Sequence, residues 1–442
     1  MGKFGMGQPI RRIEDQRFVT GTGQYTDDVN RPNQSWMAVL RSPYAHADVK
    51  SIDTTAAKVA VGVLGVFVNT DLEAAGFTDM PADSIPPGPD GTAPEAPHRP
   101  ILAKDRVRYV GEPVAVVVAE TLDQARDASE LIEVDYDERP VVADMKSALA
   151  DGAPQLFDDF TGNLLVHWSM GDKDATEAAF AKADKIVAID LVNNRIAPTA
   201  IEPRGALAEY DGDRYTLTTG TQGSHKLREW ITGKKGKKAA NIPVEKLRVI
   251  CPDVGGGFGM KNFLFNEPLA ALFATKAVGR PVKWTGDRTE SFLNDTHGRD
   301  QINHAELAVS KEGRFLAIRV SSLGNVGAYI SQFGAMIPTM AGCGMLCGCY
   351  DLEAAHVDVK VTMTNTAPVD AYRGAGRPEA AYVMERLVDK TARELGIAGD
   401  ELRRRNFIKP EAFPYKTPLG MPYDSGEYTK LMELAMKRAN WS

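Results

Sequence analysis

Alternating apolar and polar positions predict a mixture of strands and helices in the first 140 residues. The runs at 36–40 and 114–118 are short and apolar, which is typical of buried strands. The stretch from Leu122 to Ile132 has apolar residues at helical spacing. Between the two strand-like runs, segment 81–100 contains seven prolines, which cannot donate the hydrogen bonds of a sheet. We therefore expect an α+β domain interrupted by a long surface loop.

Hairpin and helix patterns continue through the rest of the chain. Turns are predicted at Asp211 with Gly212 and at Glu312 with Gly313, because alternating apolar residues flank both pairs. Helices are predicted at 267–278 and 379–395, each followed by a glycine that can end a helix. Glycine, proline and aspartate interrupt the pattern at 151–163, so we expect the main domain boundary there.

The last segment reads GEYTKLMELAMKRANWS, which predicts an amphipathic helix. No glycine, asparagine or proline cap follows it before Ser442. This pattern leads us to expect a helix cut inside a longer protein.

Composition limits the functional class. A length of 442 residues leaves room for two or three domains, and 43% hydrophobic with 25% charged residues is ordinary for a globular protein. The net charge of −7 argues against a nucleic-acid partner, which would require a basic surface. The sequence shows neither a secretory signal nor an apolar run long enough to span a bilayer, so we expect a cytoplasmic protein with no membrane partner.

The four cysteines do not suggest a disulfide framework. Cys343, Cys347 and Cys349 lie together in MAGCGMLCGCY, but their spacing matches no common zinc or iron–sulfur motif. We interpret them as small side chains in a tightly packed segment and expect no metal ligand among the protein side chains.

The strongest chemical signal is the run LRVICPDVGGGFGMK, where a predicted strand leads into Gly255 to Gly259. Glycines after a strand allow backbone N–H groups to approach an anion or a polar ring system closely. Met260 replaces the third glycine of a dinucleotide motif, and Asn262 follows Lys261 where a P-loop has serine or threonine. A nucleotide site is therefore disfavoured, and on these residues alone a simple tight turn is the alternative.

Two further glycine-flanked turns strengthen the ligand interpretation. Gln222 lies in TTGTQGSHKLREW just after a predicted strand, and Arg373 lies in NTAPVDAYRGAGRPEAAYVMER before a predicted helix. Three such turns, each presenting backbone or one polar side chain, could converge on a single bound group.

Together these segments resemble the molybdenum-binding large subunits of the xanthine dehydrogenase/aldehyde oxidase family, and most closely the form II carbon monoxide dehydrogenase-like subunits. The resemblance covers essentially the whole chain, from RRIEDQRFVTGTGQYTDDV through AIEPRGALAEYDGDRYTLTTGTQ and DVGGGFGMK to AYRGAGRPEAAYVMERLVD. It implies an α+β fold with an α/β hammerhead domain at 1–150 and the first molybdopterin-binding domain at 151–420. Residues 421–442 would begin a second, truncated or split, cofactor-binding domain.

The resemblance also implies a cofactor and partners. In this family the molybdenum is held by a pterin, in bacteria usually as a cytosine dinucleotide, and not by protein side chains. The implied reaction is hydroxylation of a substrate with water as the oxygen source. Electrons would leave through iron–sulfur and FAD groups on partner subunits.

Several residues match the family's site. Gln222 resembles the glutamine that hydrogen-bonds an oxo ligand of molybdenum. Gly256, Gly257, Phe258 and Gly259 resemble the loop beside the metal. Arg373 resembles the catalytic arginine on the substrate side, where a fixed guanidinium can stabilise an oxygen that gains negative charge. The alternative for Arg373 is a structural ion pair with a carboxylate.

Departures from better-known members narrow the substrate. Asn262 stands where purine-oxidising relatives carry glutamate, and Ala375 replaces an aromatic residue of their substrate pocket. Gly374 stands where copper-containing carbon monoxide dehydrogenases carry the copper-binding cysteine. We therefore expect an aldehyde or N-heteroaromatic substrate, with carbon monoxide as the alternative.

The family's general-base glutamate has no counterpart here, because in full-length relatives it lies in the second half of a chain almost twice as long. The resemblance therefore implies a missing C-terminal half, either as a continuation or as a separate complementary chain, without which catalysis is not expected. A subunit that carries or assembles the cofactor without turnover is the remaining alternative.

Overall fold

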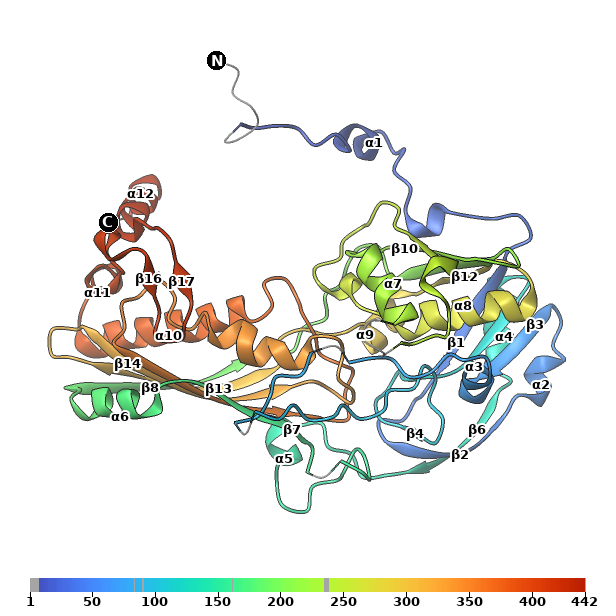
Figure 1. Cartoon of the computed structure of the whole chain (residues 1–442), viewed down its shortest axis with the longest axis horizontal. Helices are drawn as coiled ribbons and strands as arrows, with labels where there is room; N and C mark the ends of the chain where they lie inside the picture. Colours follow the sequence, from blue (N-terminus) through green and yellow to red (C-terminus); the bar gives the residue numbers. More distant parts are fainter. Residues whose placement is uncertain (1–7, 83, 90, 161, 234–237, 442) are drawn as a thin grey trace.

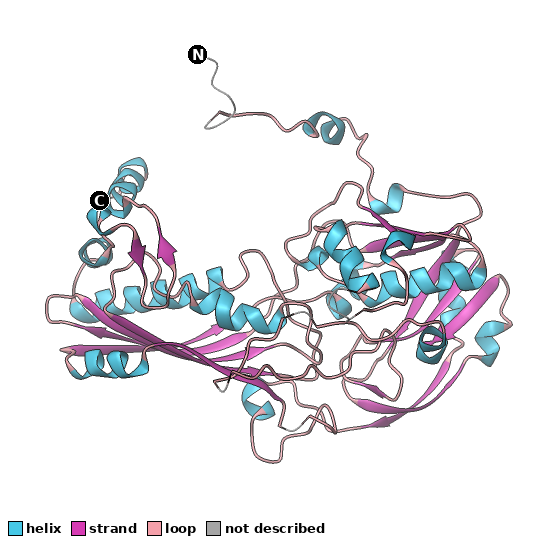
Figure 2. Ribbon diagram, viewed as in Figure 1, coloured by secondary structure: helices cyan, strands magenta, loops and turns pink. Residues whose placement is uncertain are grey.

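The structure is a computed structural model that describes residues 8–82, 84–89, 91–160, 162–233 and 238–441. Two β-rich halves lie side by side along the longest axis, with helices on both (Figure 1 and Figure 2). This mixture of helices and strands confirms the predicted α+β class.

A seven-stranded sheet forms the half on the right of Figure 1. Its strands, in spatial order, are β11 (Leu247–Ile250), β10 (Tyr215–Thr219), β9 (Gly205–Tyr210), β12 (Val282–Thr285), β1 (Ser35–Arg41), β5 (Pro113–Ala119) and β3 (Val63–Val68). The central pairing joins β1 to β12 in parallel, with Ser35 opposite Val282. Strands from both sides of the boundary predicted at 151–163 therefore share one sheet.

A five-stranded sheet forms the other half. Its order is β7 (Leu164–Gly171), β15 (Ala354–Thr362), β14 (Phe315–Asn325), β13 (Gln301–Val309) and β8 (Lys185–Asn193). The long helix α10 (Arg377–Leu395) packs on one face, and α6 (Lys173–Ala181) packs on the other (Figure 1). Smaller sheets pair β4 (Arg106–Val107) and β6 (Glu133–Glu138) with β2 (Ala47–Asp53), and β16 (Tyr415–Lys416) with β17 (Pro422–Tyr423).

The remaining α-helices connect or cover these sheets. They are α1 (Asp15–Val19), α2 (Thr55–Lys58), α3 (Asn69–Ala74), α4 (Leu122–Ser129), α5 (Met145–Ala148), α7 (Ser224–Thr232), α8 (Asn266–Val278), α9 (Arg288–Asn294), α11 (Gly399–Asn406) and α12 (Tyr428–Arg438). Short 3₁₀ turns occur at Thr26–Asp28, Val244–Lys246, Met260–Asn262, Gly334–Met336 and Pro410–Ala412, and a π-helical turn at Ile337–Ala341. None of the helices in the described residues is long and apolar enough to cross a membrane.

Most predicted elements are confirmed, with shifts at their ends. The strands at 36–40 and 114–118 are β1 and β5, and the turns at Asp211 and Glu312 join β9 to β10 and β13 to β14. Gly279 and Gly396 end α8 and α10 with φ of +67° and +65°. Helix α10 begins two residues earlier than predicted, since Pro378 fits its first turn.

The predicted end of α4 at Ile132 was wrong. The helix stops at Ser129, because Ile132 is buried in the segment that leads directly into β6.

The expectation that no cap follows the last helix was also wrong. Helix α12 ends at Arg438, and Asn440 then takes a left-handed conformation with φ of +49°. The N–H of Trp441 donates to the Met436 carbonyl at 2.9 Å, so the end of the helix is capped.

The cysteine-rich segment belongs to the larger core cluster. Cys343 and Cys347 are buried there, and burial raises the pKa of Cys343 to about 12 and that of Cys347 to about 11. These thiols therefore stay protonated and fill space beside α10, where Gly376 approaches Gly342 too closely for any side chain.

Candidate cofactor-binding site

The glycine loop follows β11 and takes a conformation that few residues other than glycine adopt. Gly256 and Gly259 have φ of +102° and +104°. Phe258, between them, also has a positive φ of +51°, and 38% of its side chain is exposed. A strained and exposed aromatic residue in such a loop indicates a functional constraint.

The loop contacts the other two predicted turns so closely that side chains are excluded. A Cβ on Gly257 would lie 2.6 Å from Gln222 Oε1, and a Cβ on Gly259 would lie 2.3 Å from the carbonyl oxygen of Ala371. The three turns predicted from the sequence therefore do converge. They join the two halves of the molecule, because α7 follows Gln222 in one half and α10 follows Arg373 in the other (Figure 1).

Gln222 is exposed, and its amide is held in one orientation. The side-chain Oε1 accepts a hydrogen bond from the Gly259 N–H at 2.8 Å. The backbone N–H of Gln222 donates to the Lys261 carbonyl at 3.0 Å. Among the described residues, its Nε2 amide donates to no partner. The side chain therefore presents a free N–H donor beside the glycine loop.

Arg373 is held by its backbone and leaves its guanidinium exposed. Its N–H donates to the Phe258 carbonyl at 2.8 Å, and its guanidinium carbon lies 5.7 Å from the centre of the Phe258 ring. Arg299 donates to the carbonyl oxygens of Tyr372 and Arg373, each at 3.0 Å, and these hydrogen bonds hold the backbone of the turn. Within the described ranges, no carboxylate lies within ion-pair distance of Arg373.

Asn262 and Ala375, which the sequence analysis predicts to contact substrate, lie beside different turns. The half-buried Asn262 lies beside the Gln222 turn, with its Oδ1 3.3 Å from the position of a Cβ on Gly223. Ala375 shares the Arg373 turn with φ of +43°, but its backbone hydrogen bonds go only to Tyr372 and Arg377.

Sequence reasoning missed two carboxylates that support these turns. Glu202 contacts the glycine loop and Lys261. Asp370 is fully buried and accepts hydrogen bonds from the N–H groups of Phe333 at 2.9 Å and Ala371 at 2.6 Å. Burial raises the pKa of Asp370 to about 6. In the sequence, these two carboxylates are marked only by their places in the family-like segments, where Glu202 lies close to Arg204 and Asp370 lies close to Arg373.

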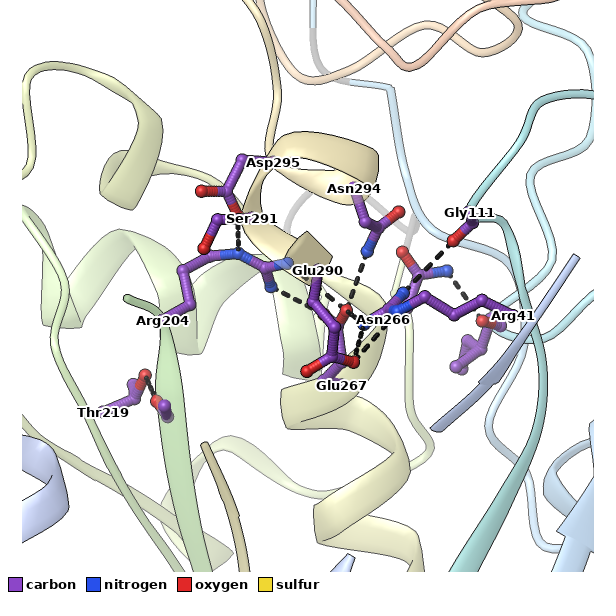
Figure 3. Close-up of polar contacts among 12 residues, drawn as sticks. Arg41, Gly111, Arg204, Thr219, Asn266, Glu267, Glu290, Ser291, Asn294 and Asp295 are labelled. Carbon is purple, nitrogen blue, oxygen red and sulfur yellow. Dashed lines mark hydrogen bonds and ion pairs between the residues drawn. The ribbon is translucent and has the colours of Figure 1, made fainter. Parts of the chain in front are cut away.

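A buried ionic network joins β1, α8 and α9 (Figure 3). Glu267 accepts from Arg204 at 2.6 Å, from Arg41 at 2.8 Å and from the Asn294 amide at 2.7 Å. Burial alone would raise the pKa of Glu267, but the guanidiniums of Arg204 and Arg41 hold it well below its ordinary value. Arg204 also pairs with Asp295 at 2.5 Å and stacks 3.8 Å above the Phe265 ring.

The site is an open surface rather than a closed pocket. Gln222, Phe258 and Arg373 are all exposed. Clefts of about 280 and 410 Å³ lie beside the proline-rich loop around His98, and residues of the three turns line neither cleft.

Comparison with known proteins shows the family to which the chain belongs. Residues 156–407 match the model of the molybdopterin cofactor-binding domain, and residues 20–140 match that of the aldehyde oxidase and xanthine dehydrogenase a/b hammerhead domain. The chain belongs to the xanthine dehydrogenase/aldehyde oxidase family. The resemblance found in the sequence is thereby confirmed, and all three turns lie within the cofactor-binding domain.

Individual relatives match over nearly all of this chain. The carbon monoxide dehydrogenase large chain of Afipia carboxidovorans is 37% identical over 98% of this chain and 53% of its own length. Quinoline 2-oxidoreductase from Pseudomonas putida 86 has a similar structure, with a TM-score of 0.89, 34% identity, and coverage of 98% of this chain and 54% of that one. This chain thus spans about half the length of both.

One relative differs in length. The nicotinate dehydrogenase large molybdopterin subunit of Eubacterium barkeri is 29% identical over 91% of this chain, and the match covers 89% of that subunit.

The residues present fit a molybdopterin cofactor. The glycine loop leaves space that any Cβ would fill, and Gln222 and Arg373 present unused donors beside it. Such donors suit an oxygen-rich, anionic group that brings its own metal ligands.

Proposed function

We propose that this chain binds a molybdenum–molybdopterin cofactor at Gln222, Gly256 to Gly259 and Arg373, as the first half of a molybdenum hydroxylase. The observation that carries the proposal is the orientation of Gln222. The hydrogen bond from the Gly259 N–H to Oε1 at 2.8 Å fixes which end of the amide is the oxygen, and the Nε2 donor, which has no partner among the described residues, is available to a ligand. An oxo group on a bound metal is the acceptor that this donor suits.

The chain's residues divide the work of the site. When bound, the cofactor supplies the centre that oxidises the substrate, with water as the oxygen source. Gln222 orients the cofactor through its Nε2 donor, and the glycine loop allows close approach of the backbone. Arg373 stabilises the substrate oxygen as it gains negative charge. The hydrogen bond from its backbone N–H to the Phe258 carbonyl holds the turn, and its guanidinium carbon lies 5.7 Å from the centre of the Phe258 ring.

The substrate we propose is an aldehyde or an N-heteroaromatic compound. Asn262 lies beside the Gln222 turn and carries no acid that could hold a purine. Ala375 supplies no aromatic ring next to Arg373. The names of two relatives, quinoline 2-oxidoreductase and nicotine 6-hydroxylase, support a heteroaromatic substrate.

Carbon monoxide is the second candidate, and the 37% identical carbon monoxide dehydrogenase large chain favours it. The Arg373 turn opposes it. Gly374 offers no thiolate for copper, its φ is +95°, and a Cβ there would lie 2.6 Å from Cγ of Pro378. A cysteine at this position would need a different turn.

The partners we propose are an iron–sulfur subunit, an FAD subunit and a chain or segment that supplies the second half of the cofactor site with its general base. The cofactor would be the cytosine dinucleotide form. The nicotinate dehydrogenase large molybdopterin subunit supports the alternative in which the second half is a separate chain, because the match with this chain covers 89% of that subunit.

The test is to purify the complex through a tag on this chain and to measure its metals, its pterin and its substrates. We expect molybdenum with a pterin cytosine dinucleotide, and dye reduction with an aldehyde or an N-heteroaromatic compound. Copper together with carbon monoxide oxidation would favour the second candidate. Molybdenum without turnover on any of these substrates would favour a cofactor-carrying subunit.

A further inference from the structure

Glu202 lies between segments that are distant in the sequence. Its Oε2 accepts hydrogen bonds from the Gly255 N–H and from Lys261 Nζ, both at 2.7 Å. Its backbone N–H donates to the Gly255 carbonyl at 3.1 Å. Glu202 therefore holds the first residue of the glycine loop from both its side chain and its backbone.

The ion pair with Lys261 is almost closed to solvent. Lys261 is only 2% exposed, and burial lowers the pKa of its ammonium group despite the attraction of Glu202. Lys261 follows the loop, and its carbonyl accepts the Gln222 N–H at 3.0 Å. Through Lys261, the carboxylate of Glu202 therefore reaches the backbone of Gln222 as well.

The N-terminal segment meets the same carboxylate. The Thr26 N–H donates to Glu202 Oε1 at 3.3 Å. Just before the loop, Asp253 forms an ion pair with Arg17 and accepts from the Gln24 N–H at 2.9 Å. Residues 17–26 are thus bound at one end to Asp253, which precedes the glycine loop, and at the other end to Glu202, which contacts it.

Space is as restricted as the hydrogen bonding. A Cβ on Gly255 would lie 2.5 Å from the Cβ of Glu202, so the loop rests directly on this residue. If Glu202 moved, Gly255 would have to move with it, because both the backbone and the side chain of Glu202 are hydrogen-bonded to Gly255.

We propose that Glu202 is a positioning residue that sets the glycine loop and Gln222 for the cofactor, by joining both to Lys261 and to the N-terminal segment. The proposal rests on the proposed function, in which this loop holds molybdopterin. In this proposal Glu202 acts through its contacts with Gly255 and Lys261, and not by a contact of its own with cofactor or substrate.

The test compares Glu202→Gln with the wild-type chain in the complex purified through a tag on this chain. Glutamine keeps the shape but removes the charge that binds Lys261 and the Gly255 N–H. We expect amide hydrogen exchange in residues 255–259 to become about tenfold faster, and molybdenum and pterin content to fall about tenfold. Exchange in β13 and β14 should not change.

Two further variants separate positioning from general stability. Glu209→Gln is the matched control, because Glu209 lies on the adjacent β9 and binds Arg31 at 2.8 Å away from the loop. It should keep both cofactor content and loop exchange. In Glu202→Gln, the buried Lys261 ammonium loses its charged partner. The double variant with Lys261→Met removes that ammonium, so it should fold even if the single variant does not. It should still lose the cofactor.

The outcomes distinguish this proposal from the proposed function. If the wild-type complex holds no molybdopterin, the proposed function fails. If the wild-type complex holds it and either Glu202 variant holds as much, with unchanged exchange at 255–259, the positioning role of Glu202 is wrong.

Discussion

Two arginines, Arg204 and Arg373, occupy opposite environments within one domain. Arg204 is 6% exposed, and its guanidinium forms ion pairs with Glu267 and Asp295 (Figure 3). Arg373 is exposed, is fixed through its backbone, and has no carboxylate within ion-pair distance among the described residues. A guanidinium that is satisfied internally stabilises the fold, whereas one that is held in place but unsatisfied is available to a ligand.

The largest effect should come from breaking the buried side of this comparison. Glu267→Gln would leave Arg204 and Arg41 without their shared carboxylate in a site that water does not reach. We expect the free energy of unfolding to fall by about 3–5 kcal/mol. Urea unfolding followed by circular dichroism measures this loss, and a change below about 1 kcal/mol would show that the network does not support the fold.

Asp370 should give the stability of the protein a pH dependence. Burial raises its folded pKa to about 6, from an ordinary value of 3.8, so the folded chain binds this proton more tightly than the unfolded chain does. Its contribution is fully present below pH 3.8 and is lost as the pH rises through about 6, which amounts to about 3 kcal/mol. Arg99 is the charged group that acts on it.

The check is urea unfolding of wild-type chain and Asp370→Asn between pH 4 and pH 7.5. Relative to the variant, the wild-type chain should lose stability as the pH rises. Parallel curves for the two proteins would place the carboxyl in a more polar environment than the one described.

Breaking the exposed side of the comparison should affect catalysis and spare the fold. Arg373→Ala loses a contact with the exposed Phe258 ring, and Gln222→Ala loses one hydrogen bond from the Gly259 N–H. Each should therefore lower the free energy of unfolding by no more than about 1 kcal/mol. In the complete complex, each should lower turnover at least about tenfold, or about 1.4 kcal/mol of barrier. Steady-state kinetics on the best substrate measure the loss, and unchanged kinetics would reject both assignments.

The smallest effect is expected at an exposed ion pair. Asp213 and Lys246 pair at the surface, where their side chains are 75% and 40% exposed. Asp213→Asn should leave both the unfolding midpoint and turnover unchanged, because water already solvates both charges. A clear loss of stability here would show that the burial of the Glu267 network does not explain its larger effect.

The three turns of the candidate site could be predicted from the sequence because each has a local signature. Glycines beside Gln222, Phe258 and Arg373 mark backbone conformations that the chain requires at those positions. The supporting carboxylates have no such mark. Glu202 lies 53 residues from Gly255, and Arg41 lies 226 residues from Glu267, so only the folded chain shows which residues pair.

The fold shows the same division between local and distant information. Short apolar runs predicted β1 and β5, and glycine caps predicted the ends of α8 and α10. The parallel pairing of β1 with β12 joins strands that lie about 245 residues apart, on either side of the predicted boundary. No local pattern in the sequence indicates that these two strands pair.

The most direct test of the account is the molybdenum and pterin content of the complex for the wild-type chain and for Gly257→Ala. The added methyl group would lie 2.6 Å from Gln222 Oε1, between the loop and the amide that we propose orients the cofactor. We predict that the wild-type complex holds both components, and that Gly257→Ala loses most of both while Gly399→Ala, on α11, loses neither. A Gly257→Ala complex with as much molybdenum and pterin as wild type would contradict the account.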